Sequence, residues 1–361
     1  MDIGIQMIFQ SWGYGDEVSD GQVYDEEIRL AVLAEELGYD ALWPVEHHFE
    51  DYSFCPDNTQ LLSYLAGRTS HIKLATGAVI IPWHDPLRVA EKISLLDHLS
   101  GGRAIFGMGR GLSRREYEPF RQDMSESRDR FDEASRMILE ALETGYIQGE
   151  GPYYPQPRTA IRPRPSRSFV GRVSQVAMSP DSVTQAARLG VKMVVFSQKA
   201  WEDQRDIFDG YRETFKSLHR HSPPPPLVCD FTFCHRDPVH AEETAREYIT
   251  GYLASVLHHY ELASDHYKDM SGYEEYGSNV EAIRHMGLER MANAYLDVQI
   301  WGTPAQIIEK LRHRRDVIGD YDLDLCFRYA GMTYDMAEDS MRTFAEEVLP
   351  AIHTWRSRDV A

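Results

Sequence analysis

The sequence feature that most constrains the fold is a regular alternation of short apolar runs with longer amphipathic patterns. Eight strand-like runs occur, at residues 3–9, 40–45, 73–81, 103–108, 173–177, 193–196, 228–234 and 323–328. Helical periodicity is clearest at residues 25–37, 58–68, 86–99 and 127–144. Strands separated by amphipathic helices form βαβ units with a parallel sheet. Eight such units without an obvious linker predict a closed (β/α)₈ barrel that spans residues 1–361 as one α/β domain.

An open, doubly wound sheet of the Rossmann type is the alternative for the same alternation. That fold binds dinucleotides through a Gly-x-Gly-x-x-Gly turn directly after the first strand. Here the corresponding segment, residues 9–15, reads Phe-Gln-Ser-Trp-Gly-Tyr-Gly. The glycine pattern is missing, which favours the closed barrel.

Two stretches interrupt the alternation and predict inserted loops. Residues 145–168 are rich in Pro and Arg and follow the fourth helical pattern. Residues 263–287 have weak periodicity and carry Tyr267, Tyr273 and Tyr276 beside two glycines. Long loops inside compact domains are usually functional or disordered. We therefore interpret residues 263–287 as a candidate cover for the active site.

The charge balance excludes several classes of partner. Lys and Arg total 38 and Asp and Glu total 57, so the formal net charge is −19. Nucleic acids and anionic membranes both require clustered basic residues. The sequence shows no N-terminal signal pattern and no apolar stretch long enough to cross a membrane. Its four cysteines include no Cys-x-x-Cys pair, which predicts neither disulfides nor a zinc site. We expect a soluble cytoplasmic protein.

Function in a (β/α)₈ barrel sits where the strands lead into the following helices. The second strand is followed there by Glu46, His47 and His48. Neighbouring residues on an extended segment point in opposite directions, so the two histidines are poorly placed to chelate one ion, and a third ligand would have to come from His84 or Asp85. We therefore predict no metal site. His47 is the better candidate for a proton-handling group, and a packed, hydrogen-bonded ring is the alternative for His48.

Two further strand ends together suggest a phosphate site. Gly109, Arg110 and Gly111 combine an approachable backbone with a guanidinium suited to phosphate oxygens. Ser179 and Pro180 read as the cap and first residue of a helix, whose free N–H groups attract anions. An ordinary helix cap is the alternative interpretation. Because the two segments follow adjacent strands, one phosphate can lie between them.

The motifs around these strand ends resemble those of bacterial luciferase and the luciferase-like flavin monooxygenases. The resemblance starts at the Glu46-His47-His48-Phe49 motif and spans nearly the whole sequence. The other matching segments are residues 76–82, 84–88, 95–97, 100–103, 106–111, 302–304 and 346–350. The block from residue 76 to residue 111 is the most specific part.

This resemblance implies a TIM barrel that binds reduced FMN and lets it react with O₂. The family's catalytic histidine matches His47, and a cis peptide bond typical of the family would fall between Gly77 and Ala78. The residues that the resemblance places at the flavin are Glu46, Gly77, Ala78, Gly109, Arg110, Met178, Ser179 and Ser182. Gly109 stands where luciferase has a cysteine, and Met178 replaces a carboxylate. Light emission and a preference for aldehydes are therefore not expected.

The resemblance also implies partners and leaves functional alternatives. Reduced FMN would come from a separate flavin reductase, the substrate would be a small organic molecule, and the protein would form a homodimer. The aromatic and histidine side chains that we place in the substrate pocket are Trp12, His48, Trp83 and Phe231. The alternatives are an F420-dependent hydride-transfer enzyme, a non-catalytic flavin-binding protein and, more distantly, a metal-dependent hydrolase.

Overall fold

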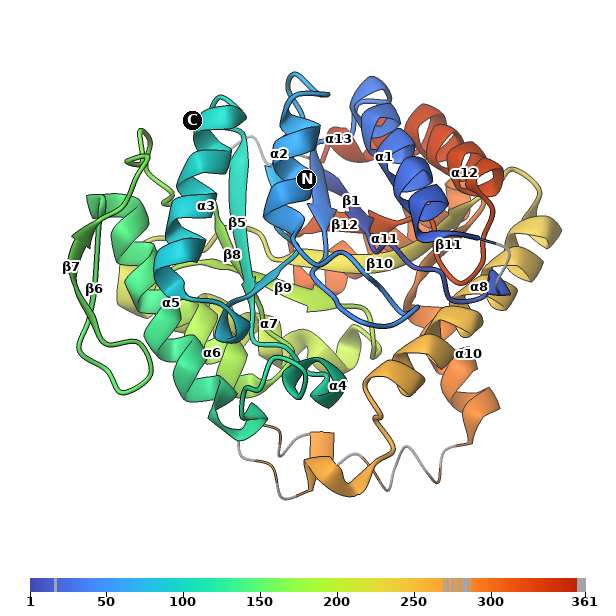
Figure 1. The fold of residues 1–361 in the computed structure, drawn as a ribbon. Coiled ribbons are helices and arrows are strands. Elements are labelled where there is room, and N and C mark those ends of the chain that lie inside the picture. The colour runs from blue at the N-terminus through green and yellow to red at the C-terminus, as the bar shows by residue number, and fades with distance from the viewer. Residues whose placement is uncertain are drawn as a thin grey trace.

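The eight principal strands of the structure form one closed parallel barrel (Figure 1). The structure is a computed structural model that describes residues 1–15, 18–268, 270, 273, 276–277, 280, 285 and 287–355. In order around the barrel, the strands are β1 (Ile3–Met7), β2 (Ala41–Pro44), β3 (Lys73–Ala75), β5 (Ala104–Gly109), β8 (Val173–Val176), β9 (Lys192–Phe196), β10 (Leu227–Cys234) and β12 (Asp322–Cys326). Pairing of β12 with β1, in which Ile3 lies opposite Leu323, closes the barrel. The predicted (β/α)₈ fold is confirmed.

The helices lie around the outside of the barrel (Figure 1). They are α1 (Asp20–Glu36), α2 (Asn58–Ala66), α3 (Pro86–Leu99), α5 (Ser127–Thr144), α6 (Pro180–Leu189), α7 (Arg205–His219), α8 (Pro238–His259), α10 (Leu288–Val298), α11 (Pro304–Ile318), α12 (Tyr334–Glu347) and α13 (Leu349–His353). The predicted bounds of α3 and α5 are confirmed at both ends. The predicted start of α1 at residue 25 is wrong, because Ser19 and Gln22 form a capping box that starts the helix at Asp20.

The predicted strand at residues 73–81 is divided into three pieces. After β3 the backbone leaves the ladder, forms the short strand β4 (Val79–Ile80), and then makes the 3₁₀ helix η2 (Ile81–Trp83). The Gly77–Ala78 peptide bond between β3 and β4 is cis, as predicted. Side chains replace the strand pairing here: the Thr76 hydroxyl bonds both the N–H and the C=O of Gly107, and Asn58 Nδ2 donates to the C=O of Ala78.

The two predicted loop excursions contain structure of their own. Residues 145–168 include an antiparallel hairpin of β6 (Tyr146–Gly149) and β7 (Gln156–Ala160), which lies at the edge of the molecule (Figure 1). Residues 263–287 include the 3₁₀ helix η5 (Asp265–Tyr267). Much of that candidate cover, namely residues 269, 271–272, 274–275, 278–279, 281–284 and 286, lies outside the described residues. A short strand, β11 (Ile300–Gly302), pairs with the end of β10 and was not predicted.

Apolar side chains pack on both sides of the barrel wall. The inner cluster contains Trp43, Leu227 and Cys229, whereas Cys234 belongs to the layer between strands and helices. Cys229 and Cys234 thus lie on opposite sides of the barrel wall, and all four cysteines are free and buried. Among the described residues, none of the helices combines the length and apolar composition needed to cross a bilayer.

Candidate active site at the carboxyl end of the barrel

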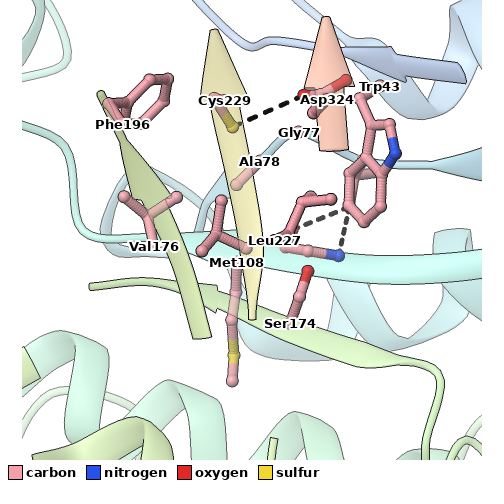
Figure 2. A pocket seen from close by; sticks show the side chains of 13 residues that line it. Trp43, Gly77, Ala78, Met108, Ser174, Val176, Phe196, Leu227, Cys229 and Asp324 are labelled. Carbon is pink, nitrogen blue, oxygen red and sulfur yellow. Dashed lines mark hydrogen bonds between the residues drawn. The ribbon is translucent and has the colours of Figure 1, made fainter. Parts of the chain in front are cut away.

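A small cavity inside the barrel has a floor of small residues near the cis peptide (Figure 2). Gly77, Ala78 and Val176 contribute to its lining, which comes from several strands and their ends. A Cβ atom at Gly109 would lie 2.9 Å from Ile80 Cδ1 and 3.5 Å from Ala78 Cβ. Gly109 therefore leaves room beside the cis peptide that any side chain would fill. The predicted flavin residues Gly77, Ala78 and Gly109 lie together.

The lining of this cavity includes a buried carboxyl group, that of Asp324. The thiol of Cys229 lies 3.6 Å from Asp324 Oδ2, and the two side chains face each other in Figure 2. Burial and the nearby charge of Asp230 raise the pKa of Asp324 well above its usual range.

The predicted phosphate segments have the local structure that the sequence indicates. Ser179 caps α6: its hydroxyl accepts from the Ser182 N–H, and the Ser182 hydroxyl in turn bonds the Ser179 N–H at 2.9 Å. Pro180 occupies the first turn of α6. Met178 precedes the cap, and its sulfur accepts the N–H of Phe196 at 3.2 Å. The N-terminus of α6 is therefore rigidly built, with the positive end of its dipole at Ser179.

Two guanidinium groups, those of Arg110 and Arg128, lie near this end of α6. The guanidinium of Arg110 stacks on the ring of Tyr273 at 3.9 Å. Arg128, near the start of α5, interacts electrostatically with Arg110 and with Asp181 in the first turn of α6. Burial and the charge of Arg110 lower the pKa of Arg128. Two neighbouring cations beside a helix N-terminus are suited to an anion such as phosphate. The sequence reasoning missed Arg128, although it is a cation in the first turn of a predicted helix.

His47 belongs to a cluster that we call the mouth cluster, formed by His47, Glu116 and His259. Glu116 lies in the short helix α4 (Arg114–Tyr117), and His259 is the last residue of α8. His47 Nδ1 lies 3.0 Å from Glu116 Oε1, which also accepts the N–H of His48 at 2.9 Å. His259 Nε2 lies 3.4 Å from the other oxygen, Oε2. One carboxylate thus contacts both imidazole rings.

The mouth cluster continues in both directions through polar contacts. His259 Nδ1 donates to Glu50 Oε2 at 2.7 Å, and Glu50 pairs with Arg115 at 2.6 Å. On the other side, the hydroxyl of Tyr260 lies 3.3 Å from His47 Nε2. The exposed fraction of the side chain is 15% for His47, 1% for Glu116 and 0% for His259. Within this cluster, it is the His47 end that reaches the mouth of the barrel.

Glu116 is held in its ionised form. Burial alone would raise the pKa of this carboxyl, but its electrostatic interactions with the adjacent imidazole rings of His47 and His259 lower it to about 2. The carboxylate therefore accepts a hydrogen bond from the neighbouring ring nitrogen, His47 Nδ1. In that arrangement His47 carries its proton on Nδ1, and Nε2 is the acceptor that meets the Tyr260 hydroxyl.

His48 belongs to a second set of residues, the wall cluster, formed by His48, Glu46 and His84. Glu46 Oε1 accepts from His84 Nε2 at 2.6 Å and lies 3.3 Å from His48 Nε2, while Oε2 accepts the Ile80 N–H. His48 is buried and packs edge-on against Trp83. The sequence-based alternative for His48, a packed and bonded ring, describes this position. His84 joins His48 in the wall cluster, so these two do not share an ion with His47.

The predicted substrate-pocket residues do not form one group. Trp83 lies with His48, and within the described residues its buried Nε1 has no hydrogen-bond partner. Trp12 lies at the rim, 5.3 Å from the ring of His258. Phe231 stacks at 3.7 Å on Tyr252, whose hydroxyl bonds Tyr52 beside the mouth cluster. The mouth therefore has at least two aromatic walls.

Described residues of the candidate cover pack on the Trp83 wall. Tyr267 and Tyr273 are buried in a cluster with Trp83, Tyr117 and Ile80. The hydroxyl of Tyr273 bonds the Gly111 C=O at 2.8 Å, and that of Tyr267 bonds the Leu112 C=O at 3.1 Å. The cover thus contacts the same loop that carries Arg110.

Sequence reasoning missed the partners of His47. Glu116 lies in an Arg-Arg-Glu-Tyr segment that is typical of an exposed helix, and His259 ends a helix far along the sequence. The one available signal was a second His-His pair, His258 and His259, directly before Tyr260 and Glu261. Its connection to His47 is made only by the fold, because the closing contacts join the ends of β2, β5 and α8.

A comparison with protein families identifies the family of this chain. The model for the luciferase-like monooxygenases matches residues 1–321. The chain belongs to the luciferase-like monooxygenase family. The resemblance inferred from the motifs at residues 46–49 and 76–111 is thereby confirmed.

Individual proteins similar to this chain cover nearly all of its length. The alkanal monooxygenase alpha chain of Aliivibrio fischeri is 26% identical over 347 residues, which are 95% of this chain and 96% of that protein. The FMN complex of the oxygenating constituent of 3,6-diketocamphane monooxygenase from Pseudomonas putida has a TM-score of 0.75 at 19% identity and covers 97% and 98% of the two chains. An F420-dependent secondary alcohol dehydrogenase has the same fold, with a TM-score of 0.72, 14% identity and coverage of 97% and 98%.

Proposed function

We propose that this monooxygenase is the oxygenase component of a two-component system that uses reduced FMN and O₂ to oxygenate a small organic substrate. One observation carries the proposal: the small residues Gly77, Ala78 and Gly109 lie together at the strand ends that also carry Arg110, the N-terminus of α6 and His47. FMN has the matching parts, namely a flat ring and a terminal phosphate. When bound, reduced FMN supplies the electrons that activate O₂.

The residues that would hold FMN have distinct tasks. Arg110, Arg128 and the N-terminus of α6 with Ser179 and Ser182 would bind the phosphate, because cations and free N–H groups stabilise an anion there. The floor of Gly77, Ala78 and Gly109 would accept the ring, since a Cβ at Gly109 would occupy the adjoining space. We propose a supporting role for Glu46 and Met178 beside these residues, because the polar atoms of both side chains are already bonded within the protein.

His47 is the proposed catalytic residue. Its Nε2 is the acceptor nitrogen of a ring whose Nδ1 is held by a carboxylate. It can therefore take a proton from a reacting group at the mouth, and the protonated ring can return that proton later in the cycle. Tyr260, which contacts Nε2, is placed to hand a proton between His47 and the mouth.

Exclusion of water is the other requirement of this chemistry. Trp83, His48 and Phe120 form one aromatic wall, and Tyr267 and Tyr273 from the candidate cover pack beside it. Phe231 and Tyr252 form another wall. We propose that the substrate binds between these walls and that residues 263–287 close over it.

The proposal includes two partners. A separate flavin reductase would supply reduced FMN, which is suggested by a relative described as an oxygenating constituent. We also propose a homodimer, since closed symmetric dimers are the commonest assembly of soluble enzymes. Sedimentation of the purified protein measures the second point directly.

The test of the proposed function separates the two flavin-type cofactors. The purified protein is titrated with reduced FMN, oxidised FMN and F420, and then supplied with a generic flavin reductase, NADH, ¹⁸O₂ and a panel of small organic compounds. We expect saturable binding of reduced FMN and one ¹⁸O atom in a product. Binding of F420 with hydride transfer, and no binding of FMN, would establish the F420-dependent alternative instead. Binding of FMN without any product or O₂ uptake would indicate a flavin-binding protein.

A further inference from the structure

A relay of polar groups runs from the mouth of the barrel to the surface through the mouth cluster. From the inside, the contacts are Tyr260 hydroxyl to His47 Nε2, His47 Nδ1 to Glu116 Oε1, Glu116 Oε2 to His259 Nε2, and His259 Nδ1 to Glu50 Oε2. Glu50, with 22% of its side chain exposed, pairs with Arg115 at the surface. Imidazole rings and carboxylates therefore alternate along the relay.

Each ring in this relay has its protonated nitrogen defined by a carboxylate. Glu116 lies at 3.0 Å from His47 Nδ1, and Glu50 lies at 2.7 Å from His259 Nδ1. A carboxylate accepts but does not donate, so both rings carry their proton on Nδ1. The Nε2 atom of His47 is left as an acceptor toward Tyr260 and the mouth, which is the form that a general base requires.

The link between Glu116 and His259 is the weakest in the relay. Within the described residues, neither Glu116 Oε2 nor His259 Nε2 has an aligned hydrogen bond, although both atoms are buried and lie 3.4 Å apart. Because Glu116 is a carboxylate, this contact stabilises it only when His259 carries a proton on Nε2 as well as on Nδ1. His259 instead holds its place by stacking on Tyr52, with ring centroids 4.3 Å apart and planes 10° apart. We therefore expect His259 to support Glu116 less strongly than Glu116 supports His47.

We propose that Glu116 is a positioning residue that fixes the Nδ1–H tautomer of His47 and stabilises its ring once Nε2 has taken a proton, with His259 and Glu50 holding Glu116 in turn. This inference rests on the proposed role of His47. The step is a transfer of one proton from a reacting group to His47 Nε2: the N–H bond forms on Nε2, the Nδ1–H bond stays intact, and Glu116 remains a carboxylate throughout. The new positive charge on the ring is then balanced 3.0 Å away.

Two variants of Glu116 separate the charge from the geometry. In Glu116→Gln the amide oxygen of the new side chain still accepts from His47 Nδ1 and from the His48 N–H, but the negative charge is gone. In Glu116→Ala the accepting oxygen and the negative charge are both removed, so that the His47 ring can change its tautomer. Glu261→Gln is the control for loss of a neighbouring carboxylate outside the relay, because Glu261 pairs with Arg114 at 3.0 Å and with Arg115 at 3.9 Å and is 21% exposed, close to the 22% of Glu50. Glu261 does not contact the His47 ring in the described structure.

The first readout needs no flavin and no substrate. ¹⁵N spectra of histidine-labelled protein report which ring nitrogen carries the proton, and His47→Asn assigns the signal. We expect the Nδ1–H form in the wild type, in Glu116→Gln and in Glu261→Gln, and a mixture of tautomers in Glu116→Ala. Circular dichroism and the melting temperature establish that each variant is folded.

The second readout is turnover at saturating reduced FMN. We expect a loss of roughly 10²-fold in Glu116→Gln, a larger loss in Glu116→Ala, a smaller one in His259→Gln and less than about twofold in Glu261→Gln, with the FMN dissociation constant unchanged within about twofold. If a folded Glu116→Ala protein keeps the single tautomer and wild-type turnover while His47→Asn is inactive, the inference is wrong and the proposed function stands. If His47→Asn itself turns over normally, the proposed role of His47 is wrong and this inference falls with it, whereas the absence of any FMN-dependent product from the wild type would refute the proposed function.

Metal analysis tests separately whether the mouth cluster holds an ion. One ligand atom from each of His47, Glu116 and His259 lies within 4.8 Å of the other two, a spacing that a metal ion could bridge. Our proposal requires that purified, active protein retains its turnover after dialysis against a chelator. A stoichiometric ion whose removal abolishes turnover would overturn it, because Glu116 would then be a ligand and not a hydrogen-bond partner.

Discussion

The mouth cluster and the wall cluster are built from the same residue types in the same pattern, yet they differ in which of their polar atoms are already bonded within the protein. Each has one carboxylate between two imidazole rings, and their first histidines are neighbours in the sequence. In the mouth cluster, His47 keeps one ring nitrogen facing a tyrosine at the mouth. In the wall cluster, Glu46 is saturated by His48, His84 and the Ile80 N–H. A single step along an extended segment therefore separates a ring with a nitrogen facing the mouth from a ring that is bonded within the protein.

The two clusters also connect different parts of the sequence. Glu46, His48 and His84 all lie within residues 46–84, next to the cis peptide and η2. His47, in contrast, meets Glu116 from the loop after β5 and His259 from the end of α8. The wall cluster therefore supports the local shape of the β3–β4 turn. The mouth cluster depends on the barrel being closed and on the cover-side loops being in place.

Replacing His47 should have the largest effect on catalysis. His47→Asn keeps a polar side chain of similar shape but cannot exchange a proton near neutral pH. We expect turnover to fall by a factor of roughly 10²–10⁴, the usual contribution of a positioned acid–base group, while FMN affinity stays near that of the wild type. Product formation driven by a flavin reductase, measured beside an FMN titration, checks both values. Unchanged turnover with normal coupling of NADH use to product would remove His47 from the mechanism.

Replacing Arg110 should affect binding and leave both histidine clusters intact. Arg110→Ala removes a charge-assisted contact, so FMN binding should weaken by about 1.5–3 kcal/mol. Riboflavin lacks the phosphate and should lose far less. Isothermal titration with FMN and riboflavin measures the contrast, and turnover at saturating FMN serves as the control. Equal losses for the two ligands would show that Arg110 does not bind the phosphate.

Shortening the candidate cover should change how much of the consumed O₂ ends as hydrogen peroxide, and should leave the mouth cluster and the wall cluster intact. Trimming residues 263–287 removes Tyr267 and Tyr273 from the Trp83 wall and admits water. We expect a several-fold rise in hydrogen peroxide at the expense of product. Limited proteolysis of the wild type within this segment should slow when flavin and substrate are bound. A cleavage rate that is the same with and without flavin and substrate would show that the segment is a surface insertion.

The two clusters should contribute to stability with opposite pH dependence. Burial lowers the pKa of His84, but the charge and hydrogen bond of Glu46 outweigh it, and the net shift is upward from 6.5. This stabilisation is complete below pH 6.5 and is lost as the pH rises through the folded-state pKa. For Glu116, whose pKa is lowered from 4.5 to about 2, the stabilisation is complete above pH 4.5 and is lost as the pH falls toward 2.

Unfolding experiments at several pH values measure these small differences. The gap in unfolding free energy between the wild type and His84→Asn should narrow above pH 6.5, whereas the gap for Glu116→Gln should narrow below pH 4.5. Arg236→Ala, which removes exposed ion pairs to Glu346 and Glu347, is a control that should change little. A gap for His84→Asn that widens with rising pH would contradict the assigned direction.

Most of the barrel could be predicted from the sequence because its signals are local. Asp85 and Pro86 start α3, and Gly145, in the left-handed conformation, ends α5. Ser179 and Pro180 likewise start α6. Each of these residues acts on backbone groups within one turn. The three-residue strand β11 and the capping box at Ser19 were missed, the first because it is too short to show a period.

The partners of His47 could not be predicted because nothing local connects them. Glu116 lies 69 residues from His47 in the sequence, and the contact exists only when β2 and β5 close into the barrel. His84 was named in the sequence only as a ligand that a metal site with His47 would have required, and the structure places it on Glu46 in the wall cluster. The tertiary structure decides which carboxylate each histidine meets, and motifs show only that histidines occur at the strand end.

The most direct test of the central claim compares His47→Asn with His48→Asn in one set of assays. Turnover at saturating reduced FMN and the free energy of unfolding are measured for both variants and the wild type. We predict that His47→Asn loses at least about 10² in turnover with little change in stability, and that His48→Asn loses about 1–3 kcal/mol of stability with turnover within about threefold. Similar losses in both quantities for the two variants would contradict the division between a reactive mouth cluster and a structural wall cluster.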